Sequence, residues 1–329
     1  MWKLITMANG GRFKMRALSD AFMHDLLSSN DGVLHPILER VHQDHTLMLA
    51  IRDGYINVYY RGGSILKLSE QRKGSYSAFF DIKYNKSEPQ CPALPSAVAS
   101  KEAAETWVDA FQDLKRIMDR FFSNHPKPER ELQQLVAREN NYSTISNESE
   151  YFISDIEVAD PLLGARLDMV ALRWLAAERK GGNNCKPAFI EMKYGDGALG
   201  GTAGLVKHLN DLDRLLGDDG RRNAMLDMME KQFSQLDLLG LLKFNRSTSV
   251  TGVELNRSVK PEVIFILANH NPRSSQLNSI LSDQEMDKFS DSPHFNLRFF
   301  VARYAGFGLH ADCMVALPEL RELLGSKDA

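Results

Sequence analysis

Two neighbouring segments of the chain combine apolar, strand-forming residues with charged ones. Residues 165–172 read Ala-Arg-Leu-Asp-Met-Val-Ala-Leu, and residues 187–194 read Pro-Ala-Phe-Ile-Glu-Met-Lys-Tyr. Side chains alternate between the two faces of a β-strand, so Phe189, Glu191 and Lys193 share one face. Strands this apolar are expected inside a sheet, where charged side chains must be paired, solvated or bound to a ligand.

A polar segment that contains glycine, residues 178–186, separates the two predicted strands. Such a segment between β-rich runs predicts the turn of an antiparallel hairpin. In a hairpin the start of the first strand lies beside the end of the second. We therefore expect Asp168 to lie close to Glu191 and Lys193.

Two carboxylates and one ammonium in one place suit metal-assisted phosphodiester hydrolysis. Oxygen ligands favour Mg²⁺ or Mn²⁺, which keep coordination positions open for water and a substrate phosphate. Lys193 could orient or deprotonate the attacking water and offset charge on the phosphoryl oxygens. The alternative is an ordinary ion pair between Lys193 and a carboxylate, which needs no metal.

At these residues the chain resembles the PD-(D/E)xK nuclease superfamily, whose pattern is an acidic residue, a spacer and then acidic-x-Lys. Asp168, Glu191 and Lys193 match that pattern, and the resemblance extends over roughly Pro126–His310. Leu167 stands where the pattern has proline, a position that varies within the family. The resemblance implies a restriction-endonuclease-like mixed sheet flanked by helices.

The same resemblance implies the roles of the site residues. Asp168, Glu191 and the backbone carbonyl of Met192 would bind Mg²⁺ or Mn²⁺, and Lys193 would act on the attacking water. The family also carries polar residues on the helix after these strands, and here Lys207 and His208 are the candidates for substrate contact. The alternative, which is the more common case for such residues, is that both are solvated side chains.

The family's preceding helix often supplies another glutamate. Pro128–Glu139 is predicted to be a helix, with proline near its start and an apolar stripe. Its glutamates at 129, 131 and 139 are all candidates, and we favour Glu129, one turn before Leu132. Acidic residues in a first turn also stabilise the helix dipole, which is a purely structural explanation.

A glycine-rich segment, residues 195–204, follows the second strand. It could bring the backbone close to a ligand, with a phosphate at the next helix N-terminus, or it could be a flexible turn. Residues 221–242 and 274–287 are predicted to be helices, and residues 261–270 and 296–304 are predicted to be strands. Alternating strands and helices indicate an α/β sheet that is covered on both sides.

The N-terminal part predicts an α+β domain with an antiparallel meander, over residues 1–95. Two helices, at about 17–29 and 35–44, precede β-rich runs joined by Asp53-Gly54, a strong hairpin signal. Residues 76–84 could add a fourth strand. Tyrosines and basic side chains here could contact nucleic acid or simply belong to amphipathic strands. The basic residues are Arg52, Arg61, Lys67, Arg72, Lys73 and Lys83.

A proline-containing stretch and a helix are predicted to join the two domains, over residues 96–125. Prolines interrupt residues 85–100, and the helix at about 101–122 repeats apolar residues at helical spacing. The third part, residues 126–329, is the predicted nuclease-like domain.

Composition bounds the function without specifying it. The 329-residue chain is 43% hydrophobic and 25% charged, with a formal charge of -3, which argues against a strongly basic coat for nucleic acid. Its three cysteines are unclustered and predict neither a disulfide framework nor a zinc module, in keeping with a reducing, cytoplasmic compartment. No signal peptide or membrane span is predicted.

The sequence thus predicts a metal-dependent nuclease that hydrolyses DNA, with RNA not excluded as substrate and no membrane partner. The sequence leaves a homo-oligomer open. The alternative is a non-catalytic protein with a degenerate nuclease fold, which binds nucleic acid or another protein.

Overall fold

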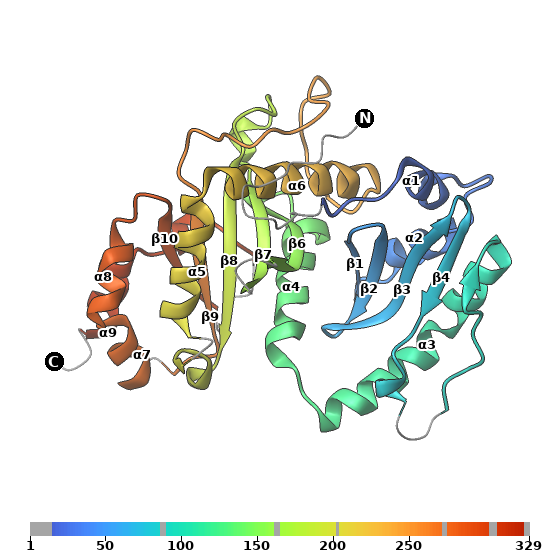
Figure 1. Ribbon diagram of the computed structural model, residues 1–329, viewed down its shortest axis with the longest axis horizontal. Helices are drawn as coiled ribbons and strands as arrows, with labels where there is room; N and C mark the ends of the chain where they lie inside the picture. The colour runs from blue at the N-terminus through green and yellow to red at the C-terminus, as the bar shows by residue number, and fades with distance from the viewer. Residues whose placement is uncertain are drawn as a thin grey trace. The chain divides into compact units, whose positions relative to one another are not determined.

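The structure is a computed structural model that describes residues 15–85, 90–160, 165–201, 204–271, 275–302 and 308–325. The chain forms two compact units. The N-terminal unit comprises residues 15–138 and Ser234–Leu242, and the C-terminal unit comprises Glu139–Phe233 and the described residues from Lys243 onward. Each unit contains one five-stranded sheet (Figure 1). The limits of these compact units differ from the domain boundaries predicted at residues 95 and 125. Whether the predicted domains fold independently remains a prediction.

The N-terminal unit contains the predicted antiparallel meander. Its strands lie in chain order: β1 (Leu47–Ile51), β2 (Tyr55–Tyr60), β3 (Gly63–Arg72), β4 (Ser75–Phe79) and β5 (Ala97–Val98). The Asp53-Gly54 hairpin is confirmed, because β1 pairs antiparallel with β2 and Gly54 adopts the left-handed φ of 70° that this turn requires. The predicted fourth strand is shorter than expected. It ends at Phe79, and a 3₁₀ turn, η1 (Ile82–Tyr84), follows.

Among its described residues, this unit contains α1 (Asp20–Leu27), α2 (His35–Gln43), α3 (Lys101–Asn124) and most of α4 (Pro128–Tyr142), with the last residues of α6 (Asp219–Leu238). The apolar face of α3, including Trp107 and Phe111, is buried. α3 approaches β3 closely, since a Cβ added at Gly63 would stand 2.8 Å from Met118 and Phe122. The predicted linking helix therefore packs inside the N-terminal unit.

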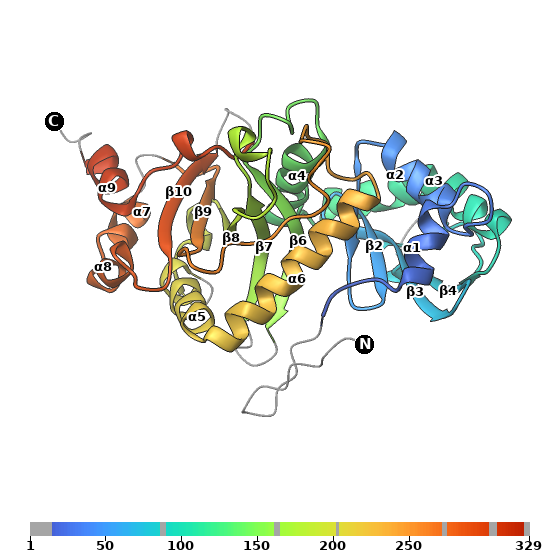
Figure 2. The ribbon, with the colours of Figure 1, turned by 90° about the horizontal axis from the view of Figure 1, so that it is seen from above.

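The C-terminal unit contains a mixed sheet in the order β10-β9-β8-β7-β6 (Figure 2). Its strands are β6 (Tyr151–Asp160), β7 (Ala165–Arg173), β8 (Lys186–Tyr194), β9 (Glu262–Ala268) and β10 (Asn296–Ala302). β6, β7 and β8 form an antiparallel meander, whereas β8, β9 and β10 are parallel. The predicted α/β class with a mixed sheet is confirmed. β6 was not predicted from the sequence.

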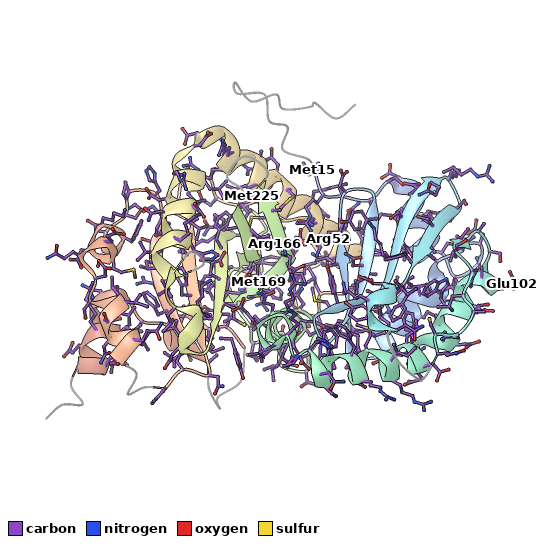
Figure 3. The ribbon with its side chains drawn as sticks, turned by 60° about the horizontal axis from the view of Figure 1, so that its bottom comes forward. Met15, Arg52, Glu102, Arg166, Met169 and Met225 are labelled. Atoms are coloured by element: carbon purple, nitrogen blue, oxygen red, sulfur yellow. The ribbon has the colours of Figure 1, made fainter. Side chains whose placement is uncertain are left out.

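Helices α5 (Leu205–Gly217) and α6 (Asp219–Leu238) lie against one face of this sheet (Figures 1 and 2). Gln232 of α6 donates a hydrogen bond of 2.7 Å to Asp155 of β6, and Met225 of α6 is fully buried (Figure 3). The helix predicted at residues 274–287 is two helices, α7 (Ser275–Leu281) and α8 (Gln284–Ser290). The break occurs where the Asp283 side chain caps the second helix.

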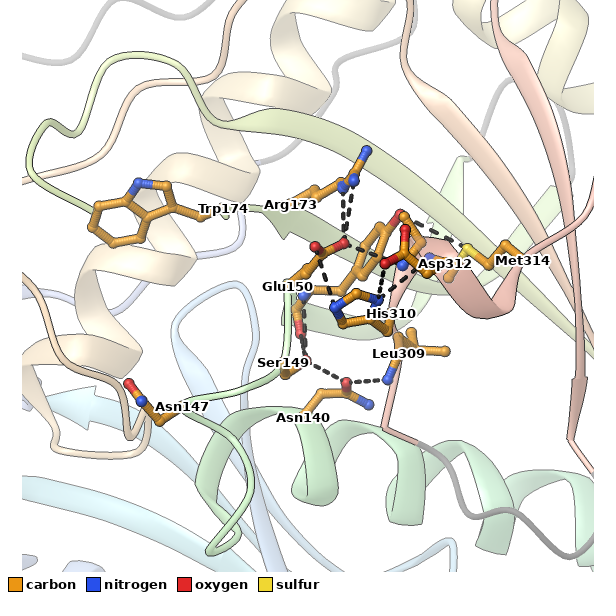
Figure 4. A network of polar contacts seen from close by, with 12 residues as sticks. Asn140, Asn147, Ser149, Glu150, Arg173, Trp174, Leu309, His310, Asp312 and Met314 are labelled. Atoms are coloured by element: carbon orange, nitrogen blue, oxygen red, sulfur yellow. Dashed lines mark hydrogen bonds and ion pairs between the residues drawn. The ribbon is translucent and has the colours of Figure 1, made fainter. Parts of the chain in front are cut away.

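A polar network fastens the segment after β10 to the sheet (Figure 4). Arg173, at the end of β7, forms ion pairs with Glu150 at 3.2 Å and Glu262 at 3.0 Å. The hydroxyl of Tyr151 donates a 2.7 Å hydrogen bond to Glu262, and the backbone N–H of Ala311 donates to Glu150 at 3.1 Å. This network lies at the opposite end of β7 from Asp168. α9 (Leu317–Gly325) then contacts β10 and α7.

Among the helices that the structure describes, none is long and apolar enough to cross a membrane.

Candidate functional site

The charged residues of β7 and β8 meet at one end of the hairpin. The regular pairing of these strands runs from Arg173 opposite Lys186 to Met169 opposite Ile190. One residue beyond the last pair, the Oδ2 atom of Asp168 accepts a hydrogen bond from the backbone N–H of Met192 at 2.8 Å. The predicted antiparallel hairpin is thus confirmed, and Asp168 lies beside the part of β8 that carries Glu191 and Lys193.

These charged side chains share one face of the sheet. Val170 of β7 pairs with Asp155 on one side and with Phe189 on the other, so the three residues define a common face. Asp168 and Glu191 are each two residues from a member of this row and therefore face the same way. It is the face covered by α5 and α6.

Glu191 lies at the centre of the cluster and is fully buried, with 0% of its side chain exposed. One carboxylate oxygen, Oε2, is 3.0 Å from Nδ1 of His208 on α5 and 4.0 Å from Nζ of Lys193. The Lys193 side chain is 5% exposed. Burying a carboxylate is costly unless positive charge or a bound cation compensates it, and Lys193 places positive charge beside Glu191.

His208 Nδ1 is the nearer of these two groups to the Glu191 carboxylate. Burial, followed by the positive charge of Lys193, lowers the pKa of His208, and the negative charges of Asp168 and Asp211 only partly oppose this. A lowered pKa favours the neutral ring at pH 7, so Lys193 is the cation of this pair of neighbours. His208, predicted as a substrate contact, therefore contacts Glu191 here.

Lys207, the other predicted substrate contact, forms an ion pair with Asp211 one turn further along α5. Asp211 is also paired with Arg214 and is largely buried. Lys207 is thus oriented along the helix toward Asp211, and its contact with substrate remains a prediction.

Glu129 lies in the first turn of α4, within the N-terminal unit, whereas the cluster belongs to the C-terminal unit. Its predicted catalytic role therefore remains a prediction. Glu131, the second candidate on this helix, forms a 2.9 Å ion pair with Arg61. Glu139, the third, lies where α4 enters the C-terminal unit.

The oxygen donors present fit a hard divalent cation. Asp168, Glu191 and the carbonyl of Met192 offer only oxygen, which Mg²⁺ and Mn²⁺ prefer. In the described ranges, no three His, Cys, Asp or Glu side chains form a metal-binding group by themselves. Two carboxylates and one carbonyl would leave coordination positions to water and a substrate phosphate, as is usual for Mg²⁺.

Two further polar residues contact this site and were not predicted. His270, two residues beyond β9, has Nε2 at 2.9 Å from the carbonyl oxygen of Lys193 and Nδ1 at 3.0 Å from Oδ1 of Asp196. Asp196 lies in the 3₁₀ turn η3 (Asp196–Ala198) after β8. The available signal was a polar residue following an apolar strand, because ligand sites of α/β sheets lie at the carboxyl ends of their parallel strands.

The residue of β6 that lies across from Asp168 has a strained backbone. Glu157 of β6 has φ of 49°, which is unfavourable for a residue other than glycine. It lies between the pairs Ile156–Met169 and Val158–Leu167, and therefore across from Asp168. Its carboxylate is 3.7 Å from Arg166.

Several basic residues of the N-terminal unit are engaged within that unit. Arg61 forms ion pairs with Asp119 and Glu131, and Arg52 is buried and donates to the hydroxyl of Tyr59. Lys83 pairs with Asp81, and Lys67 lies 4.1 Å from the ring centre of Tyr55. Arg72 and Lys73 are exposed. Nucleic-acid contact by this surface remains a prediction.

No protein-family model, curated protein or solved structure matches this chain.

Proposed function

We propose that the C-terminal unit is a divalent-metal-dependent nuclease that hydrolyses DNA phosphodiester bonds. The observation that carries this proposal is the cluster of Asp168, Glu191 and Lys193 on one face, at one end of the mixed sheet. An antiparallel meander followed by helices and a parallel strand also agrees with the restriction-endonuclease-like arrangement that the resemblance implies.

Each residue has a definite task in this proposal. Asp168, Glu191 and the Met192 carbonyl would hold Mg²⁺ or Mn²⁺, and the bound ion would supply Lewis-acid activation of the phosphate and of water. The ammonium of Lys193 would hydrogen-bond the attacking water and offset negative charge on the phosphoryl oxygens. His208, whose Nδ1 is 3.0 Å from Oε2 of Glu191, would restrict the position of that carboxylate.

The burial of Glu191 supports a functional role over a stabilising one. Buried ion pairs are often no more stabilising than well-packed apolar side chains of similar volume. The neighbours of Glu191 on this face include apolar Phe189, so an apolar residue would be compatible with the surroundings. A carboxylate at this position therefore fits a ligand for a cation.

A second candidate function is a non-catalytic nucleic-acid-binding or protein-interaction module with a degenerate nuclease fold. The observation that favours it is that Glu191 already has polar neighbours, with the Lys193 ammonium at 4.0 Å and the His208 ring nitrogen Nδ1 at 3.0 Å from Oε2. In this case the charged residues form a structural network, and a divalent cation has no part in it.

Cleavage assays with the purified chain distinguish the nuclease from the non-catalytic module. Plasmid DNA, linear DNA and single-stranded RNA are incubated with Mg²⁺, Mn²⁺ or a chelator, using wild type and the variants Asp168→Asn, Glu191→Gln and Lys193→Met. Lys186→Met, on the same strand at its far end, is the matched control. We expect metal-dependent cleavage of DNA that each site variant lowers by about 100-fold or more and the control leaves intact.

Cleavage that survives in all three site variants, or in the presence of chelator, would contradict the assignment. Folded wild-type protein that cleaves none of these substrates would favour the non-catalytic module.

A further inference from the structure

We propose that His270, held by Asp196, is a positioning residue for Lys193. The inference rests on the nuclease function proposed above. The His270 side chain is only 2% exposed, and both of its ring nitrogens are within hydrogen-bond distance of oxygen atoms: the Lys193 carbonyl at 2.9 Å and Asp196 Oδ1 at 3.0 Å.

The backbone after β9 brings this ring back onto β8. The two strands are parallel, with Lys193 opposite Leu267 and Tyr194 opposite Ala268. Asn269 then adopts a left-handed φ of 55° and turns the chain, and its side chain donates a 3.1 Å hydrogen bond to the hydroxyl of Tyr194. A non-glycine residue in this conformation is unusual and is found where the surroundings require a specific turn.

The geometry places the His270 ring between two oxygen atoms. A backbone carbonyl only accepts hydrogen bonds, so Nε2 is the donor in the contact with Lys193. The carboxylate of Asp196 lies at the other ring nitrogen, so the ring is held from both sides. This arrangement suits a rigid connection between His270 and the backbone of Lys193.

The backbone of Lys193 is thus held by a residue that follows β9, and the backbone of Met192 is held by a residue of β7. The N–H of Met192 is held by Asp168 of β7, and the carbonyl of Lys193 is held by His270 after β9. Together they restrict rotation of the backbone from which the Lys193 side chain projects. Displacing a reacting group by about 1 Å can lower a rate by about 100-fold, so this restraint has a measurable consequence.

The test compares His270→Ala, His270→Gln and the control His294→Gln in the full chain. The amide of Gln can still donate to the Lys193 carbonyl, but it carries no charge. Cleavage kinetics, thermal melts with and without Mn²⁺, and NMR signals of the His270 ring nitrogens and the Lys193 carbonyl carbon are measured. We expect wild-type His270 to carry a hydrogen on Nε2, the nitrogen that faces the Lys193 carbonyl.

We expect His270→Ala to lower kcat by about 10-fold to 100-fold, with KM for DNA and the Mn²⁺-induced rise in Tm unchanged. His270→Gln should recover part of kcat and the hydrogen-bonded carbonyl shift of Lys193. Unchanged kcat in a folded His270→Ala protein, or a wild-type Nε2 without hydrogen, would overturn the proposal. The proposal would also be overturned if kcat fell only in proportion to the loss of thermal stability and His270→Gln did not restore it.

If wild type itself cleaves nothing, the nuclease function fails, and with it the catalytic consequence. The carbonyl shift of Lys193 still reports whether His270 holds this residue: a change in His270→Ala that His270→Gln reverses supports the contact, and no change contradicts it.

Discussion

The carboxylate of Asp168 accepts a hydrogen bond from the backbone N–H of Met192, with 2.8 Å between Oδ2 and N. It does so just beyond the last regular pair of β7 and β8, Met169 with Ile190. A side chain thus serves as an acceptor where the strand ladder ends. This contact connects one proposed metal ligand to the strand that carries the other, Glu191.

The contact predicts different stabilities for two substitutions at Asp168. Asn keeps an oxygen that can accept from the Met192 N–H, whereas Ala removes it. We expect Asp168→Ala to be less stable than Asp168→Asn by about 1–3 kcal/mol, the cost of leaving a buried donor without its acceptor. Urea unfolding of both variants measures the difference. Equal free energies of unfolding would show that the contact contributes nothing.

Metal binding predicts a change in thermal stability that needs no substrate. Only the folded state brings the ligands together, so Mn²⁺ at one hundred times its dissociation constant should stabilise wild type by about 2.7 kcal/mol. Asp168→Asn should remove this response. Without metal, it should preserve or raise stability, because it relieves repulsion between Asp168 and Glu191.

The ion-pair alternative predicts the opposite pattern in the same melts. Asp168→Asn would then remove a partner of Lys193 and lower the stability of the metal-free protein. Mn²⁺ would shift neither protein. A wild-type Tm that does not respond to saturating Mn²⁺ or Mg²⁺ argues against a metal site in the free protein.

The polar network at the far end of β7 is predicted to stabilise the C-terminal unit. Arg173 contacts Glu150 and Glu262, and all three side chains are largely buried. Arg173→Met would leave two buried carboxylates without this cation and should cost about 3–5 kcal/mol. Arg166→Met, on the same strand but more than half exposed, is the control and should change stability by less than about 1 kcal/mol. Similar losses in the two variants would contradict this prediction.

The tyrosine of that network should not ionise in the neutral range. Burial and then the charge of Glu262 raise the pKa of Tyr151 above its ordinary value, so its hydroxyl remains a donor to Glu262. We expect Tyr151→Phe to destabilise the C-terminal unit by about 1–3 kcal/mol at pH 7, because Glu262 loses this hydrogen bond. Chemical denaturation of wild type and variant measures the loss.

We expect Asp44 to stabilise the N-terminal unit in a way that is lost in acid. Burial raises its pKa, but hydrogen bonds from Lys115, Thr46 and Arg40 outweigh that effect and lower the pKa well below the ordinary 3.8. A group whose pKa is lower in the folded state contributes fully above its unfolded value, and the contribution is lost as the pH falls below about 4. At pH 7 we expect Asp44→Asn to cost about 1.5–3 kcal/mol.

The difference in unfolding free energy between wild type and Asp44→Asn should therefore shrink as the pH is lowered from 5 toward 2. Asp113→Asn, at an exposed pair with Arg116, is the control and should show little difference at any pH. A difference for Asp44→Asn that is independent of pH would mean that its carboxylate does not titrate as the contacts indicate.

Local sequence was sufficient for the strands and the hairpin that carry Asp168, Glu191 and Lys193. Their alternating pattern and the polar turn between them are properties of short segments, because side-chain direction in a strand repeats every two residues. The same holds for the Asp53-Gly54 hairpin. β6 was not predicted, although it begins with the apolar run Tyr151-Phe152-Ile153. The helix predicted at residues 274–287 is interrupted because the Asp283 side chain caps a second helix.

Tertiary structure alone decided which distant residues join that cluster. His208 and His270 reach β8 only because α5 packs on one face of the sheet and β9 pairs beside it in parallel. The unit to which Glu129 belongs was likewise decided by tertiary packing, because α4 begins in the N-terminal unit. A repeating pattern fixes the direction of a side chain relative to its own strand or helix. It carries no information about which partners from other helices and strands burial and strand pairing will place against it.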